Sequence, residues 1–175
     1  VHPTLVPACH LLAQVDGVMN AVLVKGDAVG QTMYNGPGAG AGATASAVVA
    51  DIVDVARHSL SDGRAQVPYL AFVPSAVQET PVLAMDDVET AYYLRITAED
   101  RPGVLARIAS ILSDNGINIE SIVQKESEEQ DGRIPVILLT HSVLERNMNA
   151  AIAAIEALPD VPGQVVRIRA ERFGK

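Results

Sequence analysis

The chain has 175 residues, 49% of them hydrophobic, which is enough apolar side chain for the packed core of one domain or of two small ones. Its formal net charge of −8 and its aromatic content of 3% argue against nucleic acid or an anionic membrane surface as a partner, because both favour basic residues. No apolar run reaches the roughly 18 residues that span a bilayer. The single cysteine, Cys9, excludes an intrachain disulfide, and we expect it to be a small buried hydrophobe. Together these features predict a cytoplasmic protein.

The first 35 residues predict short β-strands. Residues 1–6 (VHPTLV) are apolar and β-branched, but they contain one proline and precede another, so they suit a short strand or a sheet edge. Residues 20–25 and 28–35 flank Gly26-Asp27 and alternate in the manner of a hairpin. Because a lone hairpin is marginally stable and the chain begins with Val-His-Pro, we expect it to be a piece of a longer chain whose upstream part supplies neighbours.

A glycine-rich stretch, GPGAGAGAT at residues 36–44, leads into a predicted helix over residues 45–58. A strand, a glycine loop and a helix N-terminus in that order bring backbone N–H groups together, where a phosphate or pyrophosphate can bind. The spacing lacks the Gly-Lys-Ser/Thr of a P-loop. The alternative therefore stays open that the loop only lets a helix pack closely on a sheet.

The other polar residues of this half predict no chemistry of their own. The four histidines show no metal-ligand spacing. Asp51 and Asp54 lie three residues apart on the predicted helix, which suits a solvated face better than an acid–base pair. We therefore predict no catalytic and no metal-binding residue in this chain.

Residues 59–91 separate the two halves of the chain. They contain prolines on either side of the apolar run YLAFV. This composition predicts a linker with one or two short strands.

The second half opens with the stretch around which we interpret the rest. Residues 92–98 (YYLRITA) alternate like a half-buried strand. Pro102 suits the first turn of a helix, because its missing N–H would be unpaired there, and Asp100 places negative charge near the positive end. A helix is thus predicted from about Pro102, with Asn115-Gly116 as its left-handed stop. Its apolar stripe consists of Val104, Leu105, Ile108, Ile111 and Leu112.

Two further strands follow this helix. Alternation resumes over residues 117–123 and again over residues 134–141. Between them, residues 126–132 are charged and end in Asp-Gly, which predicts an exposed hairpin loop.

A second helix and a last strand complete the pattern. Ser142 and Glu145 have capping-box spacing, and residues 165–171 alternate once more. The second helical stripe consists of Met148, Ala151, Ile152, Ile155 and Leu158. The order strand, helix, strand, strand, helix, strand predicts an α+β fold of the ferredoxin-like βαββαβ type, with four antiparallel strands and two helices on one face.

The strand followed by DRPGVLARIASILSDNGINIESI resembles an ACT domain, a small regulatory module that binds amino acids in biosynthetic enzymes. The resemblance covers about residues 92–171. It implies an effector held where the first strand turns into the first helix, and pairs of domains that share sheet edges in a homodimer or higher oligomer. The effector-binding residues that it implies are Asp100, Arg101, Pro102, Gly103, Val104, Leu105, Asn118 and Ile119.

Physical chemistry supports this location independently. Helix N-termini present unpaired N–H groups that suit a carboxylate, and Gly103 lets the backbone approach a ligand closely. The alternative is that residues 100–103 form only a favourable turn.

A second resemblance covers residues 1–57. The segments VHPTL, HLLAQVDGVMNAV and GDAVGQTMYNGPGAGAGATASAVVADIVDVAR are similar to the part of the homoserine dehydrogenase family that closes the substrate domain and returns to the cofactor domain. Followed by an ACT domain, the order is that of the longer, feedback-regulated bacterial form. The family often has proline where this chain has Ala43, a departure that touches helix initiation only. The resemblance places NADP or NAD beside the glycine loop, with backbone contacts from Gly36, Gly38, Ala39 and Gly40.

Together the resemblances imply the C-terminal part of a homoserine dehydrogenase. Residues 1–58 would be a remnant of the catalytic α/β substrate domain, residues 59–91 a linker and residues 92–175 the ACT regulatory domain. The Rossmann domain and the catalytic residues would lie upstream, so we expect this chain alone to be inactive and not to bind the cofactor.

The whole enzyme, by the same resemblance, is an NAD(P)-dependent oxidoreductase. It would interconvert L-homoserine and L-aspartate 4-semialdehyde in threonine, methionine and isoleucine biosynthesis, with threonine as an allosteric feedback inhibitor. Two alternatives stay open: an ACT-type dimerisation module without a ligand, and an autonomous nucleotide-binding domain on the glycine loop.

Overall fold

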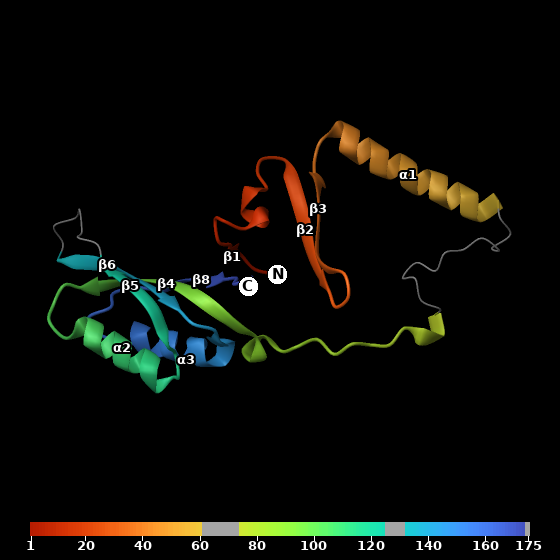
Figure 1. Cartoon of the computed structure of the whole chain (residues 1–175). Coiled ribbons are helices and arrows are strands. Elements are labelled where there is room, and N and C mark those ends of the chain that lie inside the picture. The colour runs from red at the N-terminus through yellow and green to blue at the C-terminus, as the bar shows by residue number, and fades with distance from the viewer. Residues whose placement is uncertain (61–73, 125–131, 174–175) are drawn as a thin grey trace. The chain divides into compact units, whose positions relative to one another are not determined.

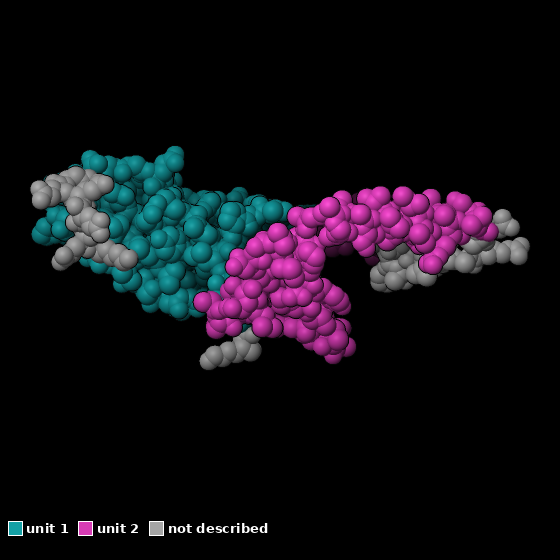
Figure 2. Space-filling view, turned by 90° about the horizontal axis from the view of Figure 1, so that it is seen from above, with its two compact units in different colours: residues 1–7, 82–175 teal, residues 8–81 magenta. Residues whose placement is uncertain are grey.

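The structure is a computed structural model that describes residues 1–60, 74–124 and 132–173. The described chain divides into two compact units, drawn in different colours in Figure 2. One unit consists of Val1–Pro7 and Val82–Lys175, and the other of Ala8–Pro81. The division after residues 58 and 91 stays a prediction. Residues 61–73 of the predicted linker and residues 126–131 of the predicted loop lie outside the described residues.

The larger unit contains a mixed sheet with two helices on one face (Figure 1). Its strands lie in the order β1 (Thr4–Leu5), β8 (Val166–Ala170), β4 (Glu89–Glu99), β6 (Arg133–Thr140) and β5 (Ile119–Gln124), and β7 (Val143–Leu144) pairs with the start of β4. The helices are α2 (Val104–Asp114) and α3 (Glu145–Glu156). Strands β8, β4, β6 and β5 pair antiparallel throughout. This arrangement confirms the predicted ferredoxin-like fold.

A fifth strand extends the sheet beyond that fold. Strand β1 pairs parallel with β8, with Thr4 opposite Arg169 and Leu5 opposite Ala170, and the N–H of Glu171 donates to the carbonyl of Leu5 at 2.9 Å. The short edge strand predicted for residues 1–6 is therefore confirmed.

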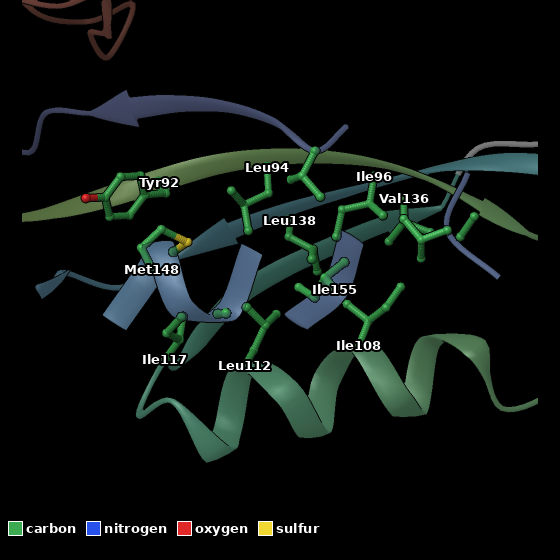
Figure 3. Packing of buried hydrophobic residues seen from close by; sticks show 14 of the residues in the cluster. Tyr92, Leu94, Ile96, Ile108, Leu112, Ile117, Val136, Leu138, Met148 and Ile155 are labelled. Atoms are coloured by element: carbon green, nitrogen blue, oxygen red, sulfur yellow. The ribbon is translucent and has the colours of Figure 1, made fainter. Parts of the chain in front are cut away.

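The core lies between the sheet and the two helices. Figure 3 shows Leu94, Ile96, Val136 and Leu138 pointing from the sheet toward the helical side chains. The helices contribute Val104, Ile108, Leu112, Met148, Ala151 and Ile155, all buried. These are the alternating strand positions and helical stripes predicted above. Full burial of each Leu or Ile side chain contributes about 1.5–3 kcal/mol, so this layer stabilises the unit more than any surface contact does.

Both helices begin differently from the prediction. Helix α2 starts at Val104 and not at Pro102, because Gly103 has φ +89° and this left-handed conformation cannot continue a helix. The stop at Asn115-Gly116 is confirmed, with Gly116 at φ +70°. The capping box at the start of α3 is wrong: Leu144 is the N-cap and no side chain caps it.

The smaller unit contains the predicted hairpin and the glycine loop. Strand β2 (Met19–Gly26) pairs antiparallel with β3 (Gly30–Pro37), and the connection lies at residues 27–29, later than the predicted Gly26-Asp27 turn. Helix α1 (Ala41–Leu60) follows and starts four residues before the predicted position. In this chain none of its residues is buried. Cys9, predicted to be buried, is exposed.

Three short 3₁₀ helices complete the described chain, at Leu11–Gln14, Pro74–Ala76 and Met85–Asp87.

Candidate functional site

Backbone hydrogen bonds fix the turn from β4 into α2. The N–H of Glu99 donates to the carbonyl of Asp160, and the N–H of Asp100 donates to the carbonyl of Gly132, both at 2.9 Å. The N–H of Arg107 donates to the carbonyl of Gly103 at 3.1 Å, which starts the helical ladder. The turn is thus tied to two loops distant in sequence.

A cavity of about 330 Å³ lies at this turn. Its lining combines charged residues of the turn with apolar residues of β4, β6 and α2. The lining residues are Ala98, Glu99, Asp100, Arg101, Pro102, Gly103, Val104, Leu105, Gln124, Ile134 and Val136. Six of the eight predicted effector residues, those from Asp100 to Leu105, are therefore brought together.

The two other predicted effector residues are elsewhere in this chain. Asn118 and Ile119 are not part of the cavity lining. The carbonyl of Asn118 accepts the N–H of His141 at 2.9 Å, and Ile119 lies opposite Thr140 at the start of β5. Within a single chain, these residues serve the pairing of β5 with β6.

Asp160 organises the charges beside the cavity. Its side chain is 11% exposed, and its carboxylate pairs with the guanidinium groups of Arg101 and Arg107. The Nη2–Oδ1 distance from Arg101 is 3.2 Å, and Arg101 also pairs with Glu99. The carboxylate thus holds the positive charge of Arg101 in the cavity wall. No local pattern in the sequence pointed to Asp160, because its partners lie more than 50 residues earlier.

The helix end that faces the cavity has backbone N–H donors that suit a ligand anion. Gly103 is the N-cap of α2 and no side chain bonds to this helix end. Backbone N–H groups of a first helical turn attract carboxylates, and the helix dipole adds to the attraction. The site therefore offers N–H groups and Arg101 to a carboxylate, and the carboxylates of Glu99 and Asp100 to an ammonium group.

A second charged cluster is buried beneath the sheet, away from this turn. The hydroxyl of Tyr92 donates to Oε2 of Glu145 at 2.6 Å. The carboxylate of Glu145 also pairs with Arg169 at 2.6 Å and with Arg167 at 3.1 Å. These contacts join β4, α3 and β8. Glu145 was predicted to cap its helix, and the structure gives its carboxylate this other role.

The environment of the cluster shifts the pKa of both acids. Burial and the hydrogen bond to Glu145 raise the pKa of Tyr92 to about 12. Burial by itself would raise the pKa of Glu145, but hydrogen bonds from Tyr92 and Arg169 and the charge of Arg167 outweigh it, so this pKa is lowered. The cluster is therefore a neutral phenol and a carboxylate held by two guanidinium groups.

The glycine loop of the smaller unit is only partly free to meet a ligand. The N–H of Gly38 donates to the carbonyl of Val18 at 2.9 Å, and a Cβ on Gly38 would lie 1.2 Å from Nδ2 of Asn20. A side chain at position 38 would therefore displace the side chain of Asn20. Gly36 and Gly40 have open space where a Cβ would be, and Gly40 has φ +114° directly before α1. Ala39 lies between Gly38 and Gly40, at the bend before α1.

In the described part of the chain, no group of three or more His, Cys, Asp or Glu side chains is placed to hold a metal ion. None of the helices described here has the length and apolarity to cross a membrane.

Comparison with known proteins finds relatives of both parts of the chain. Residues 92–168 match the ACT domain family, and residues 1–53 match the homoserine dehydrogenase family. A homoserine dehydrogenase of Pseudomonas aeruginosa is 61% identical over 173 residues, which cover 99% of this chain and 40% of that protein. A homoserine dehydrogenase of Neisseria gonorrhoeae is 50% identical over 171 residues, which cover 98% of this chain and 39% of that protein.

A solved structure of a homoserine dehydrogenase is also similar to this chain. The crystal structure of a homoserine dehydrogenase from Thiobacillus denitrificans has a TM-score of 0.86 and 58% identity, covering 99% of this chain and 38% of that one. The chain therefore spans about two fifths of the length of the relatives that it matches.

Proposed function

Residues 92–168 belong to the ACT domain family and residues 1–53 to the homoserine dehydrogenase family, and from this premise we propose that the chain is the C-terminal regulatory part of a homoserine dehydrogenase. The whole protein is then a cytoplasmic oxidoreductase that interconverts L-homoserine and L-aspartate 4-semialdehyde with NAD or NADP. In this proposal the part described here senses an end product of the pathway, threonine, and inhibits the enzyme by feedback.

The cavity at the start of α2 carries the regulatory part of the proposal. Its volume of about 330 Å³ is within the range of small-molecule sites. The N-terminus of α2 and Arg101 bind the carboxylate of threonine, and Glu99 or Asp100 binds its ammonium group. Leu105 and Val136 then face its short side chain.

A second copy of the chain completes this site in the proposed assembly. Strand β5 lies at an edge of the sheet, and an edge strand can pair with another chain. Asn118 and Ile119, which begin β5 and lie outside their own cavity, then reach the effector bound to the partner copy. Because the effector contacts both copies, it favours one arrangement of the dimer and biases the catalytic part accordingly.

The glycine loop is the proposed cofactor contact of the whole enzyme. Gly36 and Gly40 fit this role, since open space lies where their side chains would be. Gly38 contributes by shaping the loop, and Ala39 by its backbone at the bend. The nicotinamide group supplies the hydride chemistry when it is bound, and this chain supplies close backbone approach at the N-terminus of α1. We expect no NADPH binding to these 175 residues alone.

Calorimetry with L-threonine and the 175-residue chain tests the effector site. Gly103→Asp places a side chain and a negative charge in the cavity, and we expect it to abolish binding. Gly30→Asp is the matched control, because Gly30 also has positive φ, at +76°, and has open space around it. Threonine binding that Gly103→Asp leaves unchanged would refute the site.

Sedimentation with and without threonine tests the alternative of a dimerisation module without a ligand. A dimer that binds no amino acid and whose association constant no amino acid changes would favour that alternative. The proposed regulatory domain instead predicts a threonine-dependent change in association, lost in Gly103→Asp.

A further inference from the structure

A second and larger cavity lies in the same unit, lined by β1 and its continuation, β4, β5, β6, β8 and the segment after β8. Its volume is about 480 Å³. No residue of the cavity at the α2 turn takes part in its lining. Most of the lining is apolar, and its acidic residues are Glu120 and Glu171. The apolar side chains are those of Leu5, Val6, Pro7, Ala91, Leu139, Ala170 and Phe173.

One pair of opposite charges belongs to this apolar lining. The guanidinium of Arg172 pairs with the carboxylate of Glu120, and Nη2 of Arg172 is also 3.4 Å from the carbonyl of Thr140. The two side chains are 45% and 42% exposed. An exposed pair of this kind contributes little to stability, so a ligand that offers both charges can replace it at small cost.

We propose that this cavity binds a small zwitterion with an apolar side chain, that is, an apolar α-amino acid. Arg172 binds its carboxylate, Glu120 binds its ammonium group, and the side chain lies on Leu139 and the residues of β1. One ion pair within the protein is then exchanged for two ion pairs with the ligand. The inference does not depend on the effector site at the α2 turn, from which it differs in every lining residue.

The ligand would also hold β1 on the sheet. Strand β1 pairs with β8 through two residues only, yet Leu5, Val6 and Pro7 form one wall of the cavity. A ligand that contacts this wall stabilises the docked strand, because it binds only when the wall is in place. The chain continues from Pro7 directly into the smaller unit, so a ligand that stabilises the docked β1 also fixes the point at which the chain leaves this unit.

The test is calorimetry of the 175-residue chain with L-valine. Valinamide lacks the carboxylate and 3-methylbutanoate lacks the ammonium group, so each should bind more weakly than valine. Arg172→Gln and Glu120→Gln each remove one charged partner, and loss of a hydrogen bond to a charged group should weaken binding about tenfold or more. Arg146→Gln is the matched control, since Arg146 forms a similarly exposed pair with Asp87 and does not line the cavity.

Amide hydrogen exchange supplies a second readout. The N–H of Glu171 donates to the carbonyl of Leu5, so its exchange reports on the docking of β1. We expect valine to slow this exchange in the unchanged chain and in Gly103→Asp, but not in Arg172→Gln.

Two results would overturn the proposal. One is the absence of saturable valine binding, or binding that both charge variants leave unchanged. The other is valine binding that Gly103→Asp removes, because the ligand would then occupy the turn. Conversely, loss of threonine binding in Gly103→Asp with valine binding intact establishes two separate sites.

Discussion

Replacing Tyr92 by Phe tests the buried cluster that joins β4, α3 and β8. Tyr92 is 0% exposed, and its hydroxyl is 2.6 Å from Oε2 of Glu145. The substitution removes this hydrogen bond while Arg169 and Arg167 still neutralise the carboxylate. A hydrogen bond to a charged group is worth about 1.5–3 kcal/mol, so we expect the free energy of unfolding at pH 8 to fall by about 2 kcal/mol.

The difference in free energy of unfolding between the unchanged chain and Tyr92→Phe should become smaller at alkaline pH. The pKa of Tyr92 is raised to about 12 in the folded chain, whereas an unfolded tyrosine has a pKa near 10. A raised pKa gives stability that is fully present below pH 10 and is lost as the pH rises toward 12. At pH 11 the unfolded phenol is ionised and the folded one is not, which lowers the advantage of Tyr92 by about 1 kcal/mol.

Urea denaturation followed by circular dichroism at pH 8 and pH 11 measures both effects. Taking the difference between the two proteins cancels the titration of all other groups. Tyr93→Phe is the matched control, because Tyr93 is the neighbouring residue of β4 and its hydroxyl forms no hydrogen bond with another described residue. Two results would contradict this role of the hydroxyl: a loss of unfolding free energy in Tyr92→Phe no larger than in Tyr93→Phe, or a loss that is the same at both pH values.

Two further substitutions test the core and the wall of the effector cavity. Met148→Ala removes a side chain that is 0% exposed and should lower the free energy of unfolding by about 2–5 kcal/mol. Met85→Ala at a 50% exposed position should change it by less than about 0.5 kcal/mol in the same denaturation experiment, and equal effects would contradict the placement of the core. Asp160→Asn releases Arg101 and Arg107, whose side chains are 64% and 48% exposed, so unfolding should become easier by only about 1 kcal/mol. Calorimetry should nevertheless show weaker threonine binding, and unchanged affinity would mean that Asp160 does not position Arg101 for a ligand.

The features that the sequence predicted well are those written in local periodicity. Leu94, Ile96 and Ala98 alternate along β4. Val104, Ile108 and Leu112 recur at helical spacing along α2. The buried face of each element can therefore be recognised from its own residues. Once these faces are known, the ferredoxin-like order follows from the short connections between elements.

The features that the sequence missed depend on partners far away along the chain. Glu145 has the spacing of a capping residue, yet its carboxylate accepts a hydrogen bond from Tyr92, which is 53 residues away, and does not cap the helix. In the candidate site, the turn from Asp100 to Leu105 could be recognised from its own residues. Asp160 could not, because its role arises only where the loop after α3 meets that turn.

The parallel pair of β1 and β8 bears on how the ACT domain could be excised for separate study. A fragment that begins at Tyr92 would start inside β4, whose first residue is Glu89, and would lack β1 altogether. The backbone of Arg169 and Ala170 would then lose its neighbour, and an uncovered strand edge invites pairing between molecules. Such a fragment should be more prone to aggregate than the 175-residue chain, and supplying residues 1–7 as a separate peptide offers a way to cap the exposed edge.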